Sequence, residues 1–180
     1  MQFLDTGIEA LILIKPKIWK DKRGYFFESF NAAQLKEAGY QYDWVQDNEA
    51  FSTYGAIRGI HFQHAPMAQA KLVRVVKGRV LDVVIDLRPS STTFKEVRTF
   101  ELSEENKNQL LIPGGFGHGY AVLSPEAIFV YKCDNYYSPQ HEGGIRFDDP
   151  KLSIDWQIPK SDHNVSDKDL QLPFLDSLSF

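Results

Sequence analysis

The chain has 180 residues, 43% of them hydrophobic, and no Pro/Gly/Ser-rich linker divides it, so one domain with one sizeable core is expected. A net charge of −4, with acidic and basic residues interspersed, provides no broad basic surface for nucleic acid. Cys133 is the only cysteine, no apolar run approaches the roughly 20 residues of a membrane span, and the N-terminus carries no targeting pattern, which predicts a soluble cytoplasmic protein without disulfides.

In chain order, short β-prone runs alternate with turn residues. Strands are expected at 8–14, 24–30, 42–50, 57–63, 97–102, 109–112, 119–123 and 128–134, and a hairpin is expected from 71–76 and 79–87 around Lys77-Gly78. Only 32–38 and 103–107 look helical. The pattern favours an all-β barrel or double-sheet jelly roll with a few short helices. We expect a single domain over residues 1–180, with the jelly-roll core at about 8–148 and a C-terminal segment at 149–180.

The most informative stretch is the predicted strand 57–63, which places Arg58 and His61 in an otherwise apolar run, with Lys71 ten residues after the histidine. Charged groups are costly to bury without partners, so such positions usually carry chemistry. His61 can act as a general base near neutral pH, and the two cations can hold negative charge on a substrate oxygen. The alternative is a hydrogen-bonded core histidine with two surface cations.

Several motifs in one order resemble the dTDP-4-dehydrorhamnose 3,5-epimerase family. They are Val45-Gln46-Asp47-Asn48, Arg58-Gly59-Ile60-His61-Phe62-Gln63 with Lys71, Ile112-Pro113-Gly114-Gly115-Phe116-Gly117-His118-Gly119-Tyr120, and Asn135-Tyr136-Tyr137-Ser138-Pro139. The resemblance covers the chain from Lys15 to about Asp176. It implies a cupin-type jelly roll and an epimerase that inverts C3 and C5 of dTDP-4-dehydro-6-deoxy-D-glucose, giving dTDP-4-dehydro-L-rhamnose in dTDP-L-rhamnose biosynthesis.

The same motifs bear on the question of a metal. Pro113-x-Gly115-x-x-His118 resembles the second cupin motif, but metal-binding cupins have a glutamate where this chain has Lys71 and a His-x-His pair where it has His61-x-x-His64. A lysine ammonium would repel a cation from the first coordination shell. We therefore expect neither a metal nor another cofactor. The alternative is a zinc site formed by His61, His64 and His118.

For a 4-keto sugar, removing the proton at C3 or C5 leaves a carbanion that delocalises into an enolate oxygen. Lys71 is the candidate for holding that oxygen, and His61 is the candidate base. By resemblance, the acid on the opposite face is Tyr131, whose alternative role is a core aromatic. The resemblance also pairs the histidine with Asp169 in the tract Ser166-Asp167-Lys168-Asp169; Asp167 is the competing choice, and a solvated charged turn is the ordinary reading.

Substrate-binding positions are less sharply defined. Arginine presents a fixed fork of donors that suits diphosphate or carbonyl oxygens, and an aromatic ring such as Tyr137 can stack on thymine. The positions that match the family's binding site are Arg23, Glu28, Gln46, Asp47, Asn48, Arg58, His118, Tyr137, Glu142 and Lys168. The resemblance implies a homodimer with N-terminal strand exchange, in which Arg23 and Glu28 enter the partner's site. From residue type alone, surface or capping roles are the alternative for most of these positions.

One geometric difficulty concerns Arg58 and His61, which lie three positions apart and would point to opposite faces of a regular strand. A bulge at Gly59 could re-aim one of them, or the strand could serve two pockets across a dimer interface. Two other functions also stay open at this point. One is an enzyme that inverts only C3 or only C5 of a related sugar, and the more distant one is a non-catalytic or metal-dependent cupin.

Overall fold

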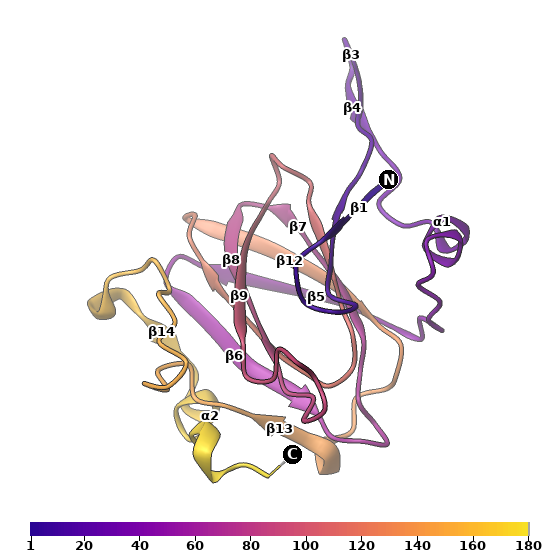
Figure 1. The fold of residues 1–180 in the computed structure, drawn as a ribbon. Helices are drawn as coiled ribbons and strands as arrows, with labels where there is room; N and C mark the ends of the chain where they lie inside the picture. Colours follow the sequence, from indigo (N-terminus) through magenta and orange to yellow (C-terminus); the bar gives the residue numbers. More distant parts are fainter. Residues whose placement is uncertain (180) are drawn as a thin grey trace.

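Two antiparallel sheets form the body of the protein. The first sheet has the order β1 (Gln2–Asp5), β2 (Ile12–Lys15), β10 (Gln109–Ile112), β7 (Lys71–Lys77), β12 (Glu126–Cys133) and β5 (Gln46–Thr53). The second sheet has the order β13 (Glu142–Gly144), β6 (Ala56–Gln63), β11 (Phe116–Val122), β8 (Arg79–Asp86) and β9 (Val97–Ser103), and the short β14 (Asn164–Val165) runs parallel to β6. The computed structural model describes residues 1–179 and is drawn in Figure 1. The arrangement agrees with the predicted all-β jelly roll with few helices.

The core lies between the sheets because side chains alternate along each strand. On β11, Tyr120 and Val122 join the inner core, whereas Ala121 between them packs on the outer face of the second sheet. That outer face is covered by apolar residues of the C-terminal segment, namely Leu152, Trp156, Ile158 and Leu175. The helix α1 (Ala32–Glu37) covers part of the outer face of the first sheet through Leu35. The C-terminal segment is thereby held beside β6.

The predicted hairpin at 71–87 is wrong. Both strands form, but β7 pairs with β10 and β12 in the first sheet, and β8 pairs with β9 and β11 in the second. The chain crosses between the sheets at Gly78, which has φ +78° and lies so close to the Glu126 carbonyl that a Cβ would stand 2.1 Å from it. Both runs are rich in β-branched residues, a composition that predicts two strands but not whether they pair with each other or lie in different sheets.

Other boundaries also differ from expectation. The predicted helix at 103–107 is a turn, in which Lys107 adopts a left-handed φ of 54°. The predicted strand 24–30 is only β4 (Gly24–Phe26), which forms a hairpin with β3 (Trp19–Asp21). The C-terminal segment contains an unpredicted helical turn, α2 (Asp167–Leu170), together with the 3₁₀ turns Lys160–Asp162 and Leu175–Ser177; a further 3₁₀ turn covers Pro139–His141. No helix in residues 1–179 is long and apolar enough to cross a membrane.

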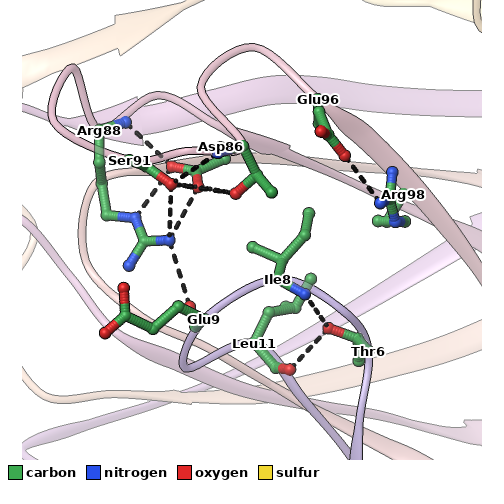
Figure 2. A network of polar contacts seen from close by, with 10 residues as sticks. Thr6, Ile8, Glu9, Leu11, Asp86, Arg88, Ser91, Glu96 and Arg98 are labelled. Atoms are coloured by element: carbon green, nitrogen blue, oxygen red, sulfur yellow. Dashed lines mark hydrogen bonds and ion pairs between the residues drawn. The ribbon is translucent and has the colours of Figure 1, made fainter.

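A polar network ties the end of β8 to the turn before β2 (Figure 2). Asp86 is fully buried and accepts hydrogen bonds from the Arg88 guanidinium, from Ser91 and from Thr93, while Arg88 also donates to the Glu9 carbonyl. Burial alone would raise the pKa of Asp86, but these hydrogen bonds outweigh it and lower the pKa from 3.8 to about 2. The network therefore holds an ionised carboxylate inside the fold.

The β3–β4 hairpin projects away from the two sheets (Figure 1). Three of its large apolar side chains are exposed: Trp19 by 45%, Tyr25 by 57% and Phe26 by 65%. Clustered exposed aromatic side chains of this kind are typical of a surface that contacts another protein.

Candidate active site

A cleft of about 450 Å³ opens between the two sheets and collects the residues of the predicted chemistry. It is lined by Arg58 and His61 from β6, Lys71 from β7, His118 from β11, Tyr131 from β12, and Lys168 and Asp169 from α2. A second hollow of about 110 Å³ shares His61, Lys71 and Tyr131 with it and extends to Gln46, Tyr137 and Glu142. Both sheets and the C-terminal segment therefore contribute to one site.

A bulge in β6 brings Arg58 and His61 to the same cleft. On β11, His118 pairs with His61 and Tyr120 pairs with Arg58, so three steps on β6 face two on β11. Gly59 permits this with φ +103°, and a Cβ there would stand 2.7 Å from the His118 carbonyl oxygen. The predicted bulge at Gly59 is confirmed, and the alternative of two pockets served by one strand is not needed.

His61 is paired with a buried carboxylate. Its Nε2 lies 2.8 Å from Asp169 Oδ1, while Asp169 Oδ2 accepts the Gly59 N–H at 3.1 Å. Ser166 caps the short helix α2 by accepting from the Asp169 N–H, which places Asp169 inward and only 4% exposed, whereas Asp167 is exposed. Burial acts to raise the pKa of Asp169, but the bonds from His61 and Gly59 outweigh it and lower that pKa below its usual value.

This pairing leaves Nδ1 of His61 without a hydrogen bond among residues 1–179. An ionised Asp169 accepts the proton on Nε2, so the neutral imidazole presents a lone pair on Nδ1. The same carboxylate stabilises the imidazolium that forms when Nδ1 takes up a proton. The geometry therefore suits a general base.

Lys71 and Tyr131 come from adjacent strands of the sheet that faces His61. Lys71 Nζ lies 6.0 Å from the centre of the Tyr131 ring and makes no hydrogen bond or ion pair within the described residues. Burial lowers the pKa of Lys71, an effect partly opposed by Cys133, Asp82 and Glu142. Burial also raises the pKa of Tyr131, which keeps its hydroxyl protonated at neutral pH. An unpaired ammonium and a phenol thus face a histidine base across the cleft.

The remaining predicted residues near the cleft form three small groups. Arg58 donates to Ser52 Oγ at 3.0 Å and to the Phe51 carbonyl. The buried His118 pairs with the fully buried Asp82 at 2.9 Å. Gln46 and Asn48 point inward from β5 and are joined by a 2.9 Å hydrogen bond.

At the rim, Glu142 joins two other predicted residues. It accepts a hydrogen bond from the Tyr137 hydroxyl at 2.9 Å and bonds from Lys168 Nζ at 2.7 and 2.8 Å. Burial acts to raise the pKa of Glu142, but Lys168 and Tyr137 outweigh it and lower that pKa. The rim therefore carries an aromatic ring fixed by a charged pair.

Three predicted residues do not reach this cleft in their own chain. The Arg23 side chain is 84% exposed in the projecting hairpin and pairs with Asp21 at 2.7 Å. Glu28 accepts hydrogen bonds from Asn31 and Gln34 beside α1.

Asp47 is the third, and it lies on the outer face of β5, where it pairs with Lys132 at 2.7 Å. Its neighbours Gln46 and Asn48 face inward because successive side chains alternate across a strand. The motif that contains all three residues therefore divides between the two faces.

Sequence reasoning also missed residues at the site. Ser52, Asp82 and Gln63 are buried and hold Arg58, His118 and the Tyr137 segment respectively. Gln63 lies two positions after His61, so strand alternation could have placed it on the same face. For Ser52 and Asp82, no local pattern signals the contact.

The donor set does not favour a metal. Residues 1–179 contain no group of three or more His, Cys, Asp or Glu side chains placed to hold a metal ion. His61 and His118 are instead each paired with a different aspartate. The alternative of a zinc site formed by His61, His64 and His118 does not fit these contacts.

Comparison with known proteins agrees with this geometry. Residues 5–177 match the family model described as dTDP-4-dehydrorhamnose 3,5-epimerase. The enzyme of that name from Shigella flexneri is 47% identical over 171 residues, covering 94% of this chain and 93% of the relative. The crystal structure of the same-named enzyme from Elizabethkingia anophelis superposes with a TM-score of 0.95 at 44% identity, covering 100% of this chain and 99% of that one.

A third relative was solved with a sugar nucleotide. The dTDP-6-deoxy-D-glucose-3,5-epimerase of Legionella pneumophila, in complex with dTDP-4-keto-L-rhamnose, has a TM-score of 0.94 at 42% identity and covers 99% of this chain and 94% of that one. The fold is thus a cupin-type jelly roll, and the match decides against the alternative of a non-catalytic cupin. The chain belongs to the dTDP-4-dehydrorhamnose 3,5-epimerase family.

Proposed function

We propose that this protein inverts C3 and C5 of dTDP-4-dehydro-6-deoxy-D-glucose to give dTDP-4-dehydro-L-rhamnose. The observation that carries the proposal is the arrangement of His61 with Asp169 on one wall of the cleft, opposite Tyr131, with the unpaired Lys71 on the same wall as the tyrosine. The substrate class is supported by the Legionella relative, whose structure contains dTDP-4-keto-L-rhamnose.

The reaction follows from acidity next to the C4 ketone. His61 Nδ1 takes the proton from C3 or C5, and the electron pair moves into the C4 oxygen, where Lys71 holds the enolate. Tyr131 then gives its proton to the same carbon from the opposite face, and the electron pair returns to re-form the ketone. Solvent resets both side chains. Because H3 and H5 lie on the same face of a gluco-configured chair, one base serves both carbons.

We propose that no metal or cofactor takes part. The Lys71 ammonium supplies the positive charge that a divalent cation would supply to an enolate. The pairing of His61 and His118 with separate aspartates supports the same view.

A homodimer completes the site in this proposal. The exposed aromatic hairpin provides a surface for a second copy, and Arg23 and Glu28, which lie away from the cleft of their own chain, are placed to enter the cleft of the partner. Mixing Arg23→Ala with His61→Asn tests this, because a heterodimer regains one site that has both native residues. Activity of the mixture equal to the sum of the two separate variants would contradict the shared site.

We further infer that all 180 residues act as one domain, since the C-terminal segment packs on the second sheet and carries Asp169. A cytoplasmic location is favoured by the lone buried Cys133, which suits a reducing compartment.

The direct test is conversion of dTDP-4-keto-6-deoxyglucose in deuterated water, followed by nuclear magnetic resonance of the product. Double epimerisation predicts deuterium at both C3 and C5 and the L-rhamno configuration. Label and inversion at only one carbon would replace the proposal with a single epimerisation. No label at either carbon would exclude proton abstraction next to the ketone.

A further inference from the structure

Gln63 occupies a buried position at the end of β6, beside the cleft. Its side chain lies two residues after His61 and is 7% exposed. Its Nε2 donates to the carbonyls of Met67 and Tyr136, and its Oε1 accepts from the Ser138 N–H at 2.7 Å. Every one of these partners is a main-chain atom, so Gln63 fixes backbone and not another side chain.

Two of these hydrogen bonds flank one residue of the site, Tyr137. Gln63 binds the carbonyl of Tyr136 and the N–H of Ser138, the main-chain groups on either side of Tyr137. From the other sheet, Gln46 Oε1 accepts the Tyr137 N–H at 3.0 Å. Two glutamines, one from each sheet, therefore hold the backbone of the segment.

The side chain of Tyr137 is fixed at its far end as well. Its hydroxyl donates to Glu142 Oε2 at 2.9 Å, yet 52% of the residue is exposed. An exposed aromatic ring anchored at its backbone and at its hydroxyl is pre-organised, so a planar ligand that stacks on it loses little ordering entropy to the protein.

We propose that Gln63 is a positioning residue for nucleotide binding, which holds Tyr137 where its ring stacks on the thymine of the substrate. The inference rests on the proposed function, and it assigns a role to a residue whose side chain hydrogen-bonds only to main-chain groups. The amide is required because it must donate to two carbonyls and accept from one N–H at the same time, which neither a carboxylate nor an apolar side chain can do.

The test is Gln63→Met, which keeps the approximate length of the side chain and removes all three hydrogen bonds. The matched control is Gln109→Met, because Gln109 is also a buried strand glutamine but its Nε2 has no partner within the described residues. Affinities for dTDP and for inorganic pyrophosphate are measured by calorimetry, with kcat and KM for the keto sugar nucleotide. A third variant combines Gln63→Met with Tyr137→Ala.

We expect Gln63→Met to weaken dTDP binding about tenfold and to raise KM by a similar factor, with kcat and pyrophosphate affinity changed less than twofold. The effect on dTDP should vanish in the Tyr137→Ala background and be absent in Gln109→Met. Unchanged dTDP affinity, equal losses for dTDP and pyrophosphate, or an undiminished effect in the Tyr137→Ala background would overturn the inference. Failure of the wild-type protein to bind dTDP would instead contradict the proposed function.

Discussion

Replacing Asp169 by asparagine should harm the base more than removing the side chain altogether. In the native site, one carboxylate oxygen accepts the Gly59 N–H at 3.1 Å and the other meets His61 Nε2 at 2.8 Å. Asparagine has a single acceptor oxygen, which accepts the hydrogen bond from the backbone N–H of Gly59. Its NH₂ group then faces His61 Nε2, and this nitrogen must become an acceptor. The imidazole proton moves to Nδ1, where it blocks proton abstraction.

The two substitutions therefore differ in magnitude. Asp169→Ala loses the charge-assisted hydrogen bond to the imidazolium, worth about 1.5–3 kcal/mol, which corresponds to a rate lower by about 10- to 160-fold. Asp169→Asn loses the same bond and also selects the wrong tautomer, so its rate should fall by about 10³–10⁴-fold.

The assay is the initial rate of deuterium incorporation at C3 and C5, with Asp167→Asn as the matched control because Asp167 is exposed on the same helix. Circular dichroism checks that each variant is folded. An asparagine variant as fast as the alanine variant, or a loss in Asp167→Asn as large as in Asp169→Asn, would refute the reasoning about the tautomer.

Two further predictions concern the cofactor and the fold. Prolonged chelation followed by dialysis should leave kcat unchanged, and an activity that falls and is restored by zinc, iron or manganese would contradict the role given to Lys71. Asp86 has a pKa of about 2 in the fold against an ordinary 3.8, so its ionised form stabilises the protein by about 2 kcal/mol at neutral pH. Since the folded pKa is the lower one, this stability is present above about pH 4 and is lost as the pH falls towards 2. Urea unfolding should show Asp86→Asn less stable than the wild type at pH 6, with a difference that shrinks at pH 3 and below; a difference independent of pH would contradict the assignment.

The positions of strands could be predicted well, because they depend on the residues within one segment of the sequence. The β-branched residues in the runs at 71–76 and 79–87 located β7 and β8, but they could not show that the two strands lie in different sheets, because strand propensity does not specify the partner strand. The bulge at Gly59 could be anticipated, since two chemically important side chains had to share a face across a glycine.

Within the site, contacts between residues close in sequence could be predicted, whereas contacts between residues far apart in sequence could not. Ser166, three residues before Asp169, is a local capping pattern, and with hindsight it explains why Asp169 rather than Asp167 turns inward. Two of the three hydrogen bonds of Gln63 reach main-chain atoms 73 and 75 residues away, which side-chain patterns do not reveal. Arg23 and Glu28 cannot be placed by one chain's own contacts if they act in the cleft of a second copy.

In the proposed mechanism, His61 and Tyr131 act from opposite walls of the cleft. The most direct test of it compares Tyr131→Phe with Lys71→Ala in deuterated water. Tyr131→Phe should still exchange the protons at C3 and C5, because His61 can return what it removes, but the configuration should be retained. Lys71→Ala should suppress both exchange and inversion, because the enolate itself becomes too costly to form. Equal loss of exchange and inversion in both folded variants would contradict the assignment of Tyr131 as the acid that faces His61.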